Sequence, residues 1–323
     1  MKKILLCIIA VTLTAFVAPC HADTWNGVSS DTSWYVEGQT EYHIQNAAQL
    51  KGLADLVNNQ SLTFDGCTVY LDTDIDLNHK QWIPIGYRNV VTQSVTFNGD
   101  FDAQGFSIEN LNINSSQLPN NGGIFNMGLF GNSEGEITNL ILNGEINIGE
   151  GETMLASLIY VGGIVGHGHN INNSKCNVTI NFNDITHSLG TPNLHIGLAA
   201  GAADDVQYVK SSGAMWFNSY YPNKGIIGSV VGKARLVNQC ASDAYLAVPG
   251  APGDFYDLRI GGIVGECPEV SNCIFTGTAS VYNHSGATDK GIFFGGICSG
   301  METGTISDCI FAPNEFKTNL GFS

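Results

Sequence analysis

Short glycine-flanked apolar motifs recur along the chain at a nearly constant spacing. Small and apolar residues that return at a fixed phase are typical of a solenoid, in which each unit buries its apolar face only against its neighbours. Successive motifs begin 35, 35, 31, 33 and 34 residues apart, so we predict a stack of repeating units. The motifs are MGLFG (Met127–Gly131), GGIVG (Gly162–Gly166), GLAAG (Gly197–Gly201), GSVVG (Gly228–Gly232), GGIVG (Gly261–Gly265) and GGICS (Gly295–Ser299).

The residues that follow each motif alternate between apolar and polar side chains. Ile137–Leu142, Val270–Phe275 and Ile306–Phe311 share one order, in which Asn or Asp precedes a Leu or Cys. Alternation with a period of two predicts strands, and short strands separated by Gly, Asn and Asp predict several strands per unit. Helical repeats are excluded because they would need two amphipathic runs per unit and few glycines. We therefore predict an all-β fold, a parallel β-helix with equivalent side chains above one another.

A short helix is predicted ahead of the coils, over about residues 46–58. Asn46 is the expected N-cap, and Gln49 is its expected reciprocal partner three residues later. An open-ended solenoid exposes unpaired strand edges, so we expect this helix to cover the N-terminal end. Trp34, Tyr35 and Trp82 are expected to belong to the same cap. The apolar residues at helical spacing are Ala47, Leu50, Leu53, Ala54 and Val57.

The first residues predict export. Lys2 and Lys3 precede an apolar run from Ile4 to Ala18, which is typical of a secretory signal peptide spanning residues 1–22 and cleaved before Asp23. Lipoprotein processing before Cys20 is the less favoured alternative because Pro19 precedes it. We expect a lead-in segment over residues 23–43 and a single β-helix domain over 44–323, located in the envelope, at the surface or outside a bacterium.

The charge balance excludes nucleic acid as a partner. After cleavage, 11 basic side chains remain against 29 acidic ones, and no Lys/Arg cluster is present. A phosphate polymer needs a basic track that displaces its counterions, and an anionic membrane surface needs basic residues as well. The acidity favours solubility outside the cell over attraction to a specific cationic ligand.

The cysteines predict a buried column rather than a disulfide framework. Seven remain after residue 22, an odd number, and four of them lie 12 to 14 residues after the start of a motif. Leu140 fills the same slot in an earlier repeat, so cysteine behaves there as a small buried hydrophobe. We predict free inward-facing thiols in this slot and neither a structural metal nor a cofactor. The four cysteines are Cys176, Cys240, Cys273 and Cys309.

The chain resembles the GLUG-motif repeat family of bacterial surface proteins. The resemblance rests on NAAQLKGLADLVNN, VYLDTDIDLNHKQWIPIG, FNGDFDAQGFSIENLNI, GLFGNSEGEITNLIL and the GGIVG units, and it spans residues 40–311, with GLUG-type repeats over about 127–311. The family includes predicted adhesins and the N-terminal regions of IgA-cleaving metallopeptidases. Membership implies a right-handed parallel β-helix at the cell envelope. The resemblance implies no catalysis, because the HExxH peptidase motif is absent from the sequence.

Candidate metal ligands have simpler interpretations. His167 and His169 could pair on a metal, but no third ligand can be named from the sequence. Asp72, Asp74 and Asp76 alternate with inward-facing Val69, Leu71, Thr73, Ile75 and Leu77, so we interpret them as a solvated strand face rather than a calcium site. Asp100 and Asp102 are interpreted as turn residues.

The favoured ligand-binding candidate is an aromatic insertion between two units, over residues 215–223. Exposed Trp and Tyr rings suit sugar rings or a protein partner, and loops that leave the stack can vary without disturbing it. The alternative is that these rings fold back over the flank of the β-helix. The residues that we assign to ligand binding are Trp216, Phe217, Tyr220 and Tyr221.

We therefore expect an exported, non-catalytic, adhesin-like scaffold that binds a glycan or an extracellular protein. No catalytic residue is predicted. One alternative is a β-helical polysaccharide lyase or glycoside hydrolase, which would be favoured by a groove with facing carboxylates or with carboxylates beside Lys or Arg. The other alternative is a structural spacer without a ligand.

Overall fold

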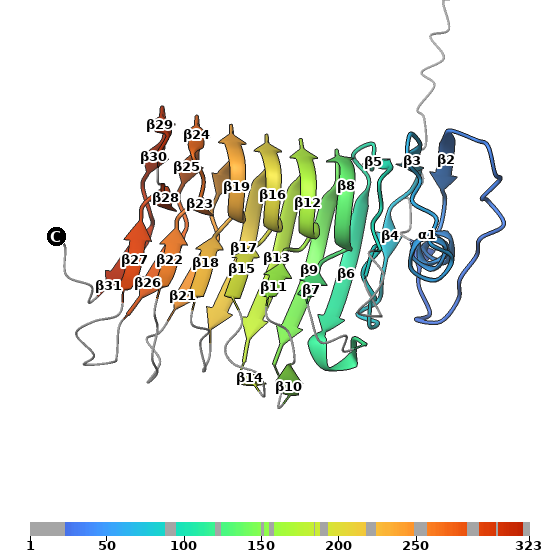
Figure 1. Ribbon diagram of the computed structural model, residues 1–323, viewed down its shortest axis with the longest axis horizontal. Coiled ribbons are helices and arrows are strands. Elements are labelled where there is room, and N and C mark those ends of the chain that lie inside the picture. The colour runs from blue at the N-terminus through green and yellow to red at the C-terminus, as the bar shows by residue number, and fades with distance from the viewer. Residues whose placement is uncertain are drawn as a thin grey trace, which may run out of the picture.

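The protein is an elongated stack of parallel strands with a helix at its N-terminal end (Figure 1). A computed structural model describes residues 23–87, 95–119, 124–149, 152–154, 158–183, 185–187, 193–217, 224–248, 257–282, 291–301 and 303–318. Every strand pair in this part of the chain is parallel, and successive coils add strands to three long sheets. The fold is a right-handed parallel β-helix, as the sequence and its resemblance led us to expect. The predicted signal peptide lies outside the described residues.

The three long sheets form the faces of the β-helix. Sheet A contains β1 (Asp23–Thr24), β4 (Ile75–Asp76), β6 (Ser107–Asn114), β9 (Ile141–Ile148), β13 (Lys175–Phe182), β17 (Lys210–Phe217), β20 (Ala241–Ser242), β21 (Tyr245–Val248), β25 (Ile274–Phe275), β26 (Thr278–Val281), β30 (Ile310–Phe311) and β31 (Glu315–Thr318). Sheet B contains β2 (Glu41–Ile44), β3 (Thr68–Leu71), β5 (Asp100–Asp102), β8 (Phe130–Thr138), β12 (Val165–Asn172), β16 (Ala200–Gln207), β19 (Val231–Asn238), β23 (Val264–Glu266), β24 (Glu269–Ser271), β28 (Cys298–Gly300) and β29 (Thr305–Ser307).

From Ile124 onward, each coil also contains a sheet C strand, which precedes the sheet B strand along the chain. Sheet C contains β7 (Ile124–Met127), β11 (Leu158–Val161), β15 (Asn193–Gly197), β18 (Lys224–Gly228), β22 (Asp257–Gly261) and β27 (Gly291–Gly295). Two further strands, β10 (Glu152–Met154) and β14 (Ile185–His187), pair with each other outside the three faces, and a short 3₁₀ turn lies at Ser115–Gln117.

The core consists of columns of equivalent apolar side chains. In sheet A, Ile146, Ile180, Met215, Leu246 and Ala279 pair coil to coil and are at most 1% exposed. Each side chain packs on its equivalent in the next coil, as the period predicted, because in-register parallel pairing repeats at about 4.8 Å. Burial of the apolar face therefore requires neighbouring coils on both sides.

The motif glycines mark the bend between sheets C and B, where no side chain fits. Gly197, Gly228, Gly261 and Gly295 pair in one column. A Cβ added to Gly228 would lie 2.1 Å from the backbone oxygen of Val231, within its own coil. Glycine is required here because the backbone itself occupies the space of a side chain. The recurring motif thus encodes the tight bend.

A second bend, between sheets B and A, needs a left-handed backbone conformation. Its residues have φ between +44° and +57° in six successive coils: Asn139, Asn173, Tyr208, Gln239, Asn272 and Asp308. Asn and Asp tolerate this region better than other non-glycine residues. The amide of Asn173 also donates to Oδ1 of Asn139 at 2.7 Å, and that of Asn272 donates to Oδ1 of Asn238 at 3.0 Å. Asn139, Asn272 and Asp308 thus form the turn that precedes each sheet A strand.

The cysteine column is confirmed for three of the four predicted members. Cys240, Cys273 and Cys309 occupy equivalent positions next to paired strands, and the Cys273 backbone N–H donates to Sγ of Cys309 at 3.4 Å. Cys176 was assigned to this column wrongly, because it pairs with Leu142 and Ser211, two residues farther along the strand. The column position and the position of Cys176 both face inward, so the number of residues from the start of the motif does not distinguish them. The seven described cysteines are all free.

The predicted capping helix is present as α1 (Ala47–Gln60). The Oδ1 of Asn46 accepts from the Gln49 backbone N–H at 2.9 Å, as expected for the N-cap. The Gln49 side chain, however, accepts a hydrogen bond from the Gln45 N–H at 2.8 Å. The prediction that Gln49 pairs reciprocally with Asn46 is therefore wrong. The helix ends at Gln60, and the C-cap residue Ser61 has the left-handed conformation. It covers the first coil at the N-terminal end of the stack (Figure 1).

Two strands of the β-helix begin within the predicted lead-in segment over residues 23–43. Its strand β1 pairs with β4, and β2, which pairs with β3, begins at Glu41. Trp82 is fully buried and donates from Nε1 to the Leu129 carbonyl at 3.0 Å, while Trp34 and Tyr35 pack in an aromatic cluster with Tyr42 and Phe64. Trp34 and Tyr35 therefore pack at the N-terminal end, as predicted, whereas the hydrogen bond of Trp82 reaches a later coil.

We expect the left-handed column to limit stability. Asn272→Val places a β-branched residue at φ +55° and should lower the free energy of unfolding by about 1–2 kcal/mol. Asn272→Gly retains access to this conformation and is the matched control. Urea unfolding followed by far-UV circular dichroism measures both, and equal loss in the two variants would contradict the backbone explanation.

Thiol reactivity should follow burial. Burial raises the pKa of Cys176, and it raises the pKa of Cys267 to about 12, so both thiols should resist alkylation in the native state. Cys67, Cys298 and Cys309 are half-buried, and burial raises the pKa of Cys298 and Cys309, so Cys67 should be modified first. Peptide mass spectrometry after a short iodoacetamide pulse at pH 8 measures the order, with a guanidinium-unfolded sample as the control. Early modification of Cys176 would contradict the inward assignment.

Candidate functional site

Two of the four aromatic residues that we predicted to bind a ligand lie in a strand, and their side chains have different surroundings. Trp216 and Phe217 lie in β17 rather than in a loop, and they point to opposite faces of sheet A. Phe217 is 1% exposed and stacks on Phe182 in the core at 5.6 Å, so it is not available to a ligand. Trp216 is 39% exposed and lies over Tyr245 with ring centroids 4.7 Å apart. Tyr220 and Tyr221 lie outside the described residues.

The acidic candidates hydrogen-bond to neighbouring coils. Asp72 accepts from Gln104 at 3.1 Å and lies 2.9 Å from Nδ1 of His43. The other acids in these two groups likewise accept hydrogen bonds: Asp74 from Ser107, Asp76 from Asn110, Asp100 from the Glu136 N–H and Asp102 from Asn139. They therefore tie one coil to the next.

The two candidate histidines lie in strand β12 and have different neighbours. His169 contacts Asp204, with 3.3 Å between Nε2 and Oδ2. The Nδ1 of His167 lies 3.2 Å from Oδ1 of Asn132 in the preceding coil. Within the residues that the structure describes, no group of three or more His, Cys, Asp or Glu side chains is placed to hold a metal ion.

A groove runs along the bend between sheets C and B, and we call it the bend groove. Two columns of outward-facing side chains form its walls. The sheet C wall consists of Asn126, Tyr160, His195, Ile226, Arg259 and Phe293, which pair in register. The sheet B wall consists of Asn132, His167, Ala202, Lys233, Glu266 and Gly300. Contacts between His167 and Tyr160, and between Glu266 and Arg259, connect the two walls.

The last glycine of the GGIVG-type motifs lets the two walls approach each other. A Cβ on Gly201 would lie 2.5 Å from the backbone nitrogen of Val161, and one on Gly166 would lie 2.7 Å from that of Met127. Sheet B therefore begins directly against the sheet C strand of the preceding coil. The outward-facing side chains of the sheet C wall and the sheet B wall therefore face each other across the bend.

Aromatic and imidazole rings occupy the first half of the bend groove. The Tyr160 ring makes edge contacts with His167 at 5.0 Å and with His195 at 4.9 Å. Burial lowers the pKa of His195 to about 4, with a further decrease from the positive charge of Lys233. Burial also raises the pKa of Tyr160. The side chains of His195 and Tyr160 are therefore uncharged at neutral pH.

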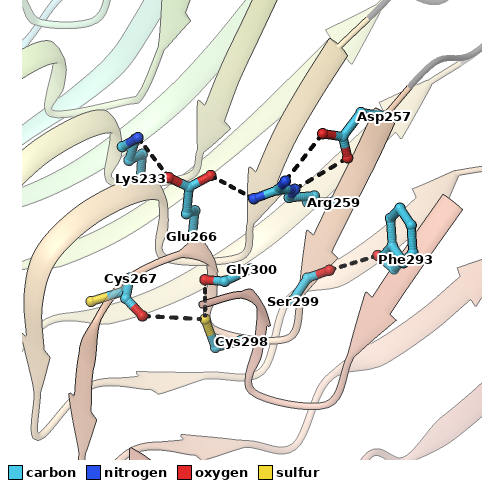
Figure 2. Close-up of polar contacts among 9 residues, drawn as sticks. All are labelled: Lys233, Asp257, Arg259, Glu266, Cys267, Phe293, Cys298, Ser299 and Gly300. Carbon is cyan, nitrogen blue, oxygen red and sulfur yellow. Dashed lines mark hydrogen bonds and ion pairs between the residues drawn. The ribbon is translucent and has the colours of Figure 1, made fainter. Parts of the chain in front are cut away.

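Four charged side chains occupy the second half (Figure 2). Glu266 accepts from Lys233 at 2.6 Å and from Arg259 at 3.0 Å, while Arg259 also donates to both oxygens of Asp257 at 3.1 and 3.2 Å. The two positive and two negative charges balance. These groups are partly exposed, so the network positions side chains more than it stabilises the fold.

The bend groove is not among the features that we predict from the sequence. The signal was available, because one wall lies two residues before the first glycine of each GGIVG-type motif and the other directly follows its last glycine. The first motif follows the same rule when it is counted from Gly128, since Met127 pairs with Val161 and Asn126 with Tyr160. The fact that these two positions face each other follows only from the direction of the bend.

No family model and no curated protein matches the chain. One solved structure is similar, that of a protein from Bacteroides ovatus provisionally named an immunoglobulin A1 protease. The two share 16% identity and a TM-score of 0.44 over 86% of this chain and 84% of the other. No helix in the described part of the chain is long and apolar enough to span a membrane.

We expect His195 to make the protein sensitive to acid. Its folded-state pKa of about 4 lies below the unfolded value near 6.5, so its neutral form contributes stability above pH 6.5 that is lost as the pH falls toward 4. Wild-type protein should therefore lose more stability between pH 7 and pH 4.5 than His195→Gln. Urea midpoints at the two pH values test this, and an NMR titration of His195 with a midpoint near 6.5 would contradict it.

Proposed function

We propose that the protein is an exported, non-catalytic binding scaffold that presents the bend groove to a glycan or an extracellular protein at the bacterial cell envelope. The observation that carries this proposal is the continuity of the two facing walls across successive coils, which offers an extended ligand many equivalent contacts. Export follows from the predicted signal peptide, and the resemblance to GLUG-motif surface proteins agrees with it.

The chemistry of the walls supports binding. The aromatic half supplies ring surface with hydrogen-bonding groups at its edge, the combination that suits sugars and protein side chains. The charged half holds Arg259 and Lys233 in fixed positions through their carboxylate partners. Preorganised side chains lose little conformational entropy when a ligand binds. The groove thus requires no reactive side chain to be useful.

A glycan-active enzyme is the second candidate, because carboxylates lie beside Lys and Arg in the groove (Figure 2). In this hypothesis, Glu266 or Asp257 would transfer a proton to or from a bound sugar. Both carboxylates already accept charge-assisted hydrogen bonds from cations, so their observed contacts are those of structural partners. We therefore favour binding.

The proposal predicts which surface binds. On an array of glycans and extracellular-matrix proteins, Tyr160→Ala should weaken binding by about tenfold through loss of ring contacts, whereas Trp216→Ala should bind as wild type does. Loss only in Trp216→Ala would instead place the site on the flank of sheet A. A wild-type protein that binds nothing would favour a structural spacer.

The same array glycans test the enzyme hypothesis. Incubation with wild-type protein should release no new reducing ends or unsaturated products. Products that appear with wild type and disappear with Glu266→Gln would replace the binding proposal with catalysis.

A further inference from the structure

The first half of the bend groove is divided into two adjoining hollows by a shared ridge. Tyr160 and His167 line both hollows. The hollow on one side has a volume of about 230 Å³ and is bordered by Asn126 and Asn132. The other has a volume of about 450 Å³ and is bordered by His195. A ligand that fills both must pass over the ridge.

The larger hollow exists because a wall position carries a small side chain. Ala202 lies between His167 and Lys233 in the sheet B wall, so the column is interrupted where its neighbours are long. Gly168, Ala203 and Ala234 also border this hollow and add apolar surface. The result is a hollow with an apolar lining and polar side chains at its rim, which matches the apolar ring face and the polar hydroxyl edge of a pyranose.

Two polar atoms beside the ridge have no partner in the described part of the chain. Asn126 Oδ1 and His195 Nδ1 are both buried and unbonded there, and these residues pair directly with Tyr160 on either side of it. Other amides on the solenoid, such as those of Asn173 and Asn181, bond to their equivalents in the preceding coil. A buried unsatisfied group costs about 1–3 kcal/mol. A ligand hydroxyl that either side chain turns toward would recover part of this cost.

The charges around the hollows favour an uncharged ligand. The ammonium of Lys233 is paired with Glu266, and Arg235 is paired with Asp205. Asp204 and Glu134, which also border the hollows, carry negative charge. An acidic sugar would therefore meet carboxylates and cations that already have partners, and its desolvation would be poorly compensated.

We propose, building on the function proposed above, that the two hollows are consecutive subsites for an extended, uncharged oligosaccharide that lies along the solenoid axis. Tyr160 and His167 contact the linkage between two sugar rings, Ala202 contacts an apolar ring face, and Asn126 and His195 bond hydroxyl groups. Equivalent wall positions repeat at the coil spacing of about 4.8 Å, which is roughly one position per sugar ring. Successive sugar rings of a regular polymer can therefore contact equivalent positions in successive coils.

Calorimetric titration of the mature protein with neutral hexasaccharides of β-1,4-glucose, β-1,4-mannose and β-1,4-xylose, and with hexagalacturonate, tests this proposal. At least one neutral hexasaccharide should bind. Ala202→Leu should weaken that binding by about tenfold or more, because the added side chain fills the larger hollow. The matched control is Ala241→Leu, an outward-facing position on sheet A between Lys210 and Ile274, which should bind as wild type does.

Asn126→Leu provides a second variant, because it removes the hydrogen-bonding group and keeps the side-chain size. It should weaken binding while leaving the circular dichroism spectrum unchanged. Preference for hexagalacturonate, unchanged binding in Ala202→Leu, or no binding of any hexasaccharide would each overturn the proposal. The binding function proposed above would survive such a result if the protein bound another ligand on the array and Tyr160→Ala abolished that binding. Failure of the oligosaccharide proposal can therefore be distinguished from failure of the binding proposal.

Discussion

In-register stacking of parallel strands is the constraint on which the rest of the structure depends. Each coil satisfies the backbone hydrogen bonds of the next, and each inward side chain is buried only by its equivalents above and below. Apolar columns, the thiol column and the asparagine bends all follow from this single repeat. The same repeat also arranges outward side chains in columns, so any surface feature extends along the axis.

The bend groove shows how packing requirements create a surface with functional potential. Glycine is needed at the bend because neighbouring backbone occupies the space of a Cβ, as at Gly228. The tight bend then turns two outward columns toward each other. Ring contacts around Tyr160 and the ion pairs around Arg259 are consequences of that geometry. The regularity of the repeat is interrupted at Ala202, and this departure creates the larger hollow.

The two ends of the stack differ. Helix α1 and a cluster of aromatic rings cover the first coil. At the other end of the described region, residues equivalent to buried positions are exposed. Ile306 is 47% exposed, whereas its partner Val270 is fully buried, and Phe311 is 36% exposed against none for Phe275. This contrast illustrates directly how much burial a coil gains from its neighbour.

The sequence by itself determined the solenoid, its strands, the capping helix and the inward residues, because these depend on local alternation and on a period that survives in one dimension. It placed Cys240, Cys273 and Cys309 correctly but not Cys176, since two inward positions two residues apart satisfy the same count. It assigned Phe217 to a binding loop, whereas strand β17 directs it into the core. Only the tertiary structure decided that Tyr160 faces His167, because contact across a bend depends on its angle and not on spacing along the chain.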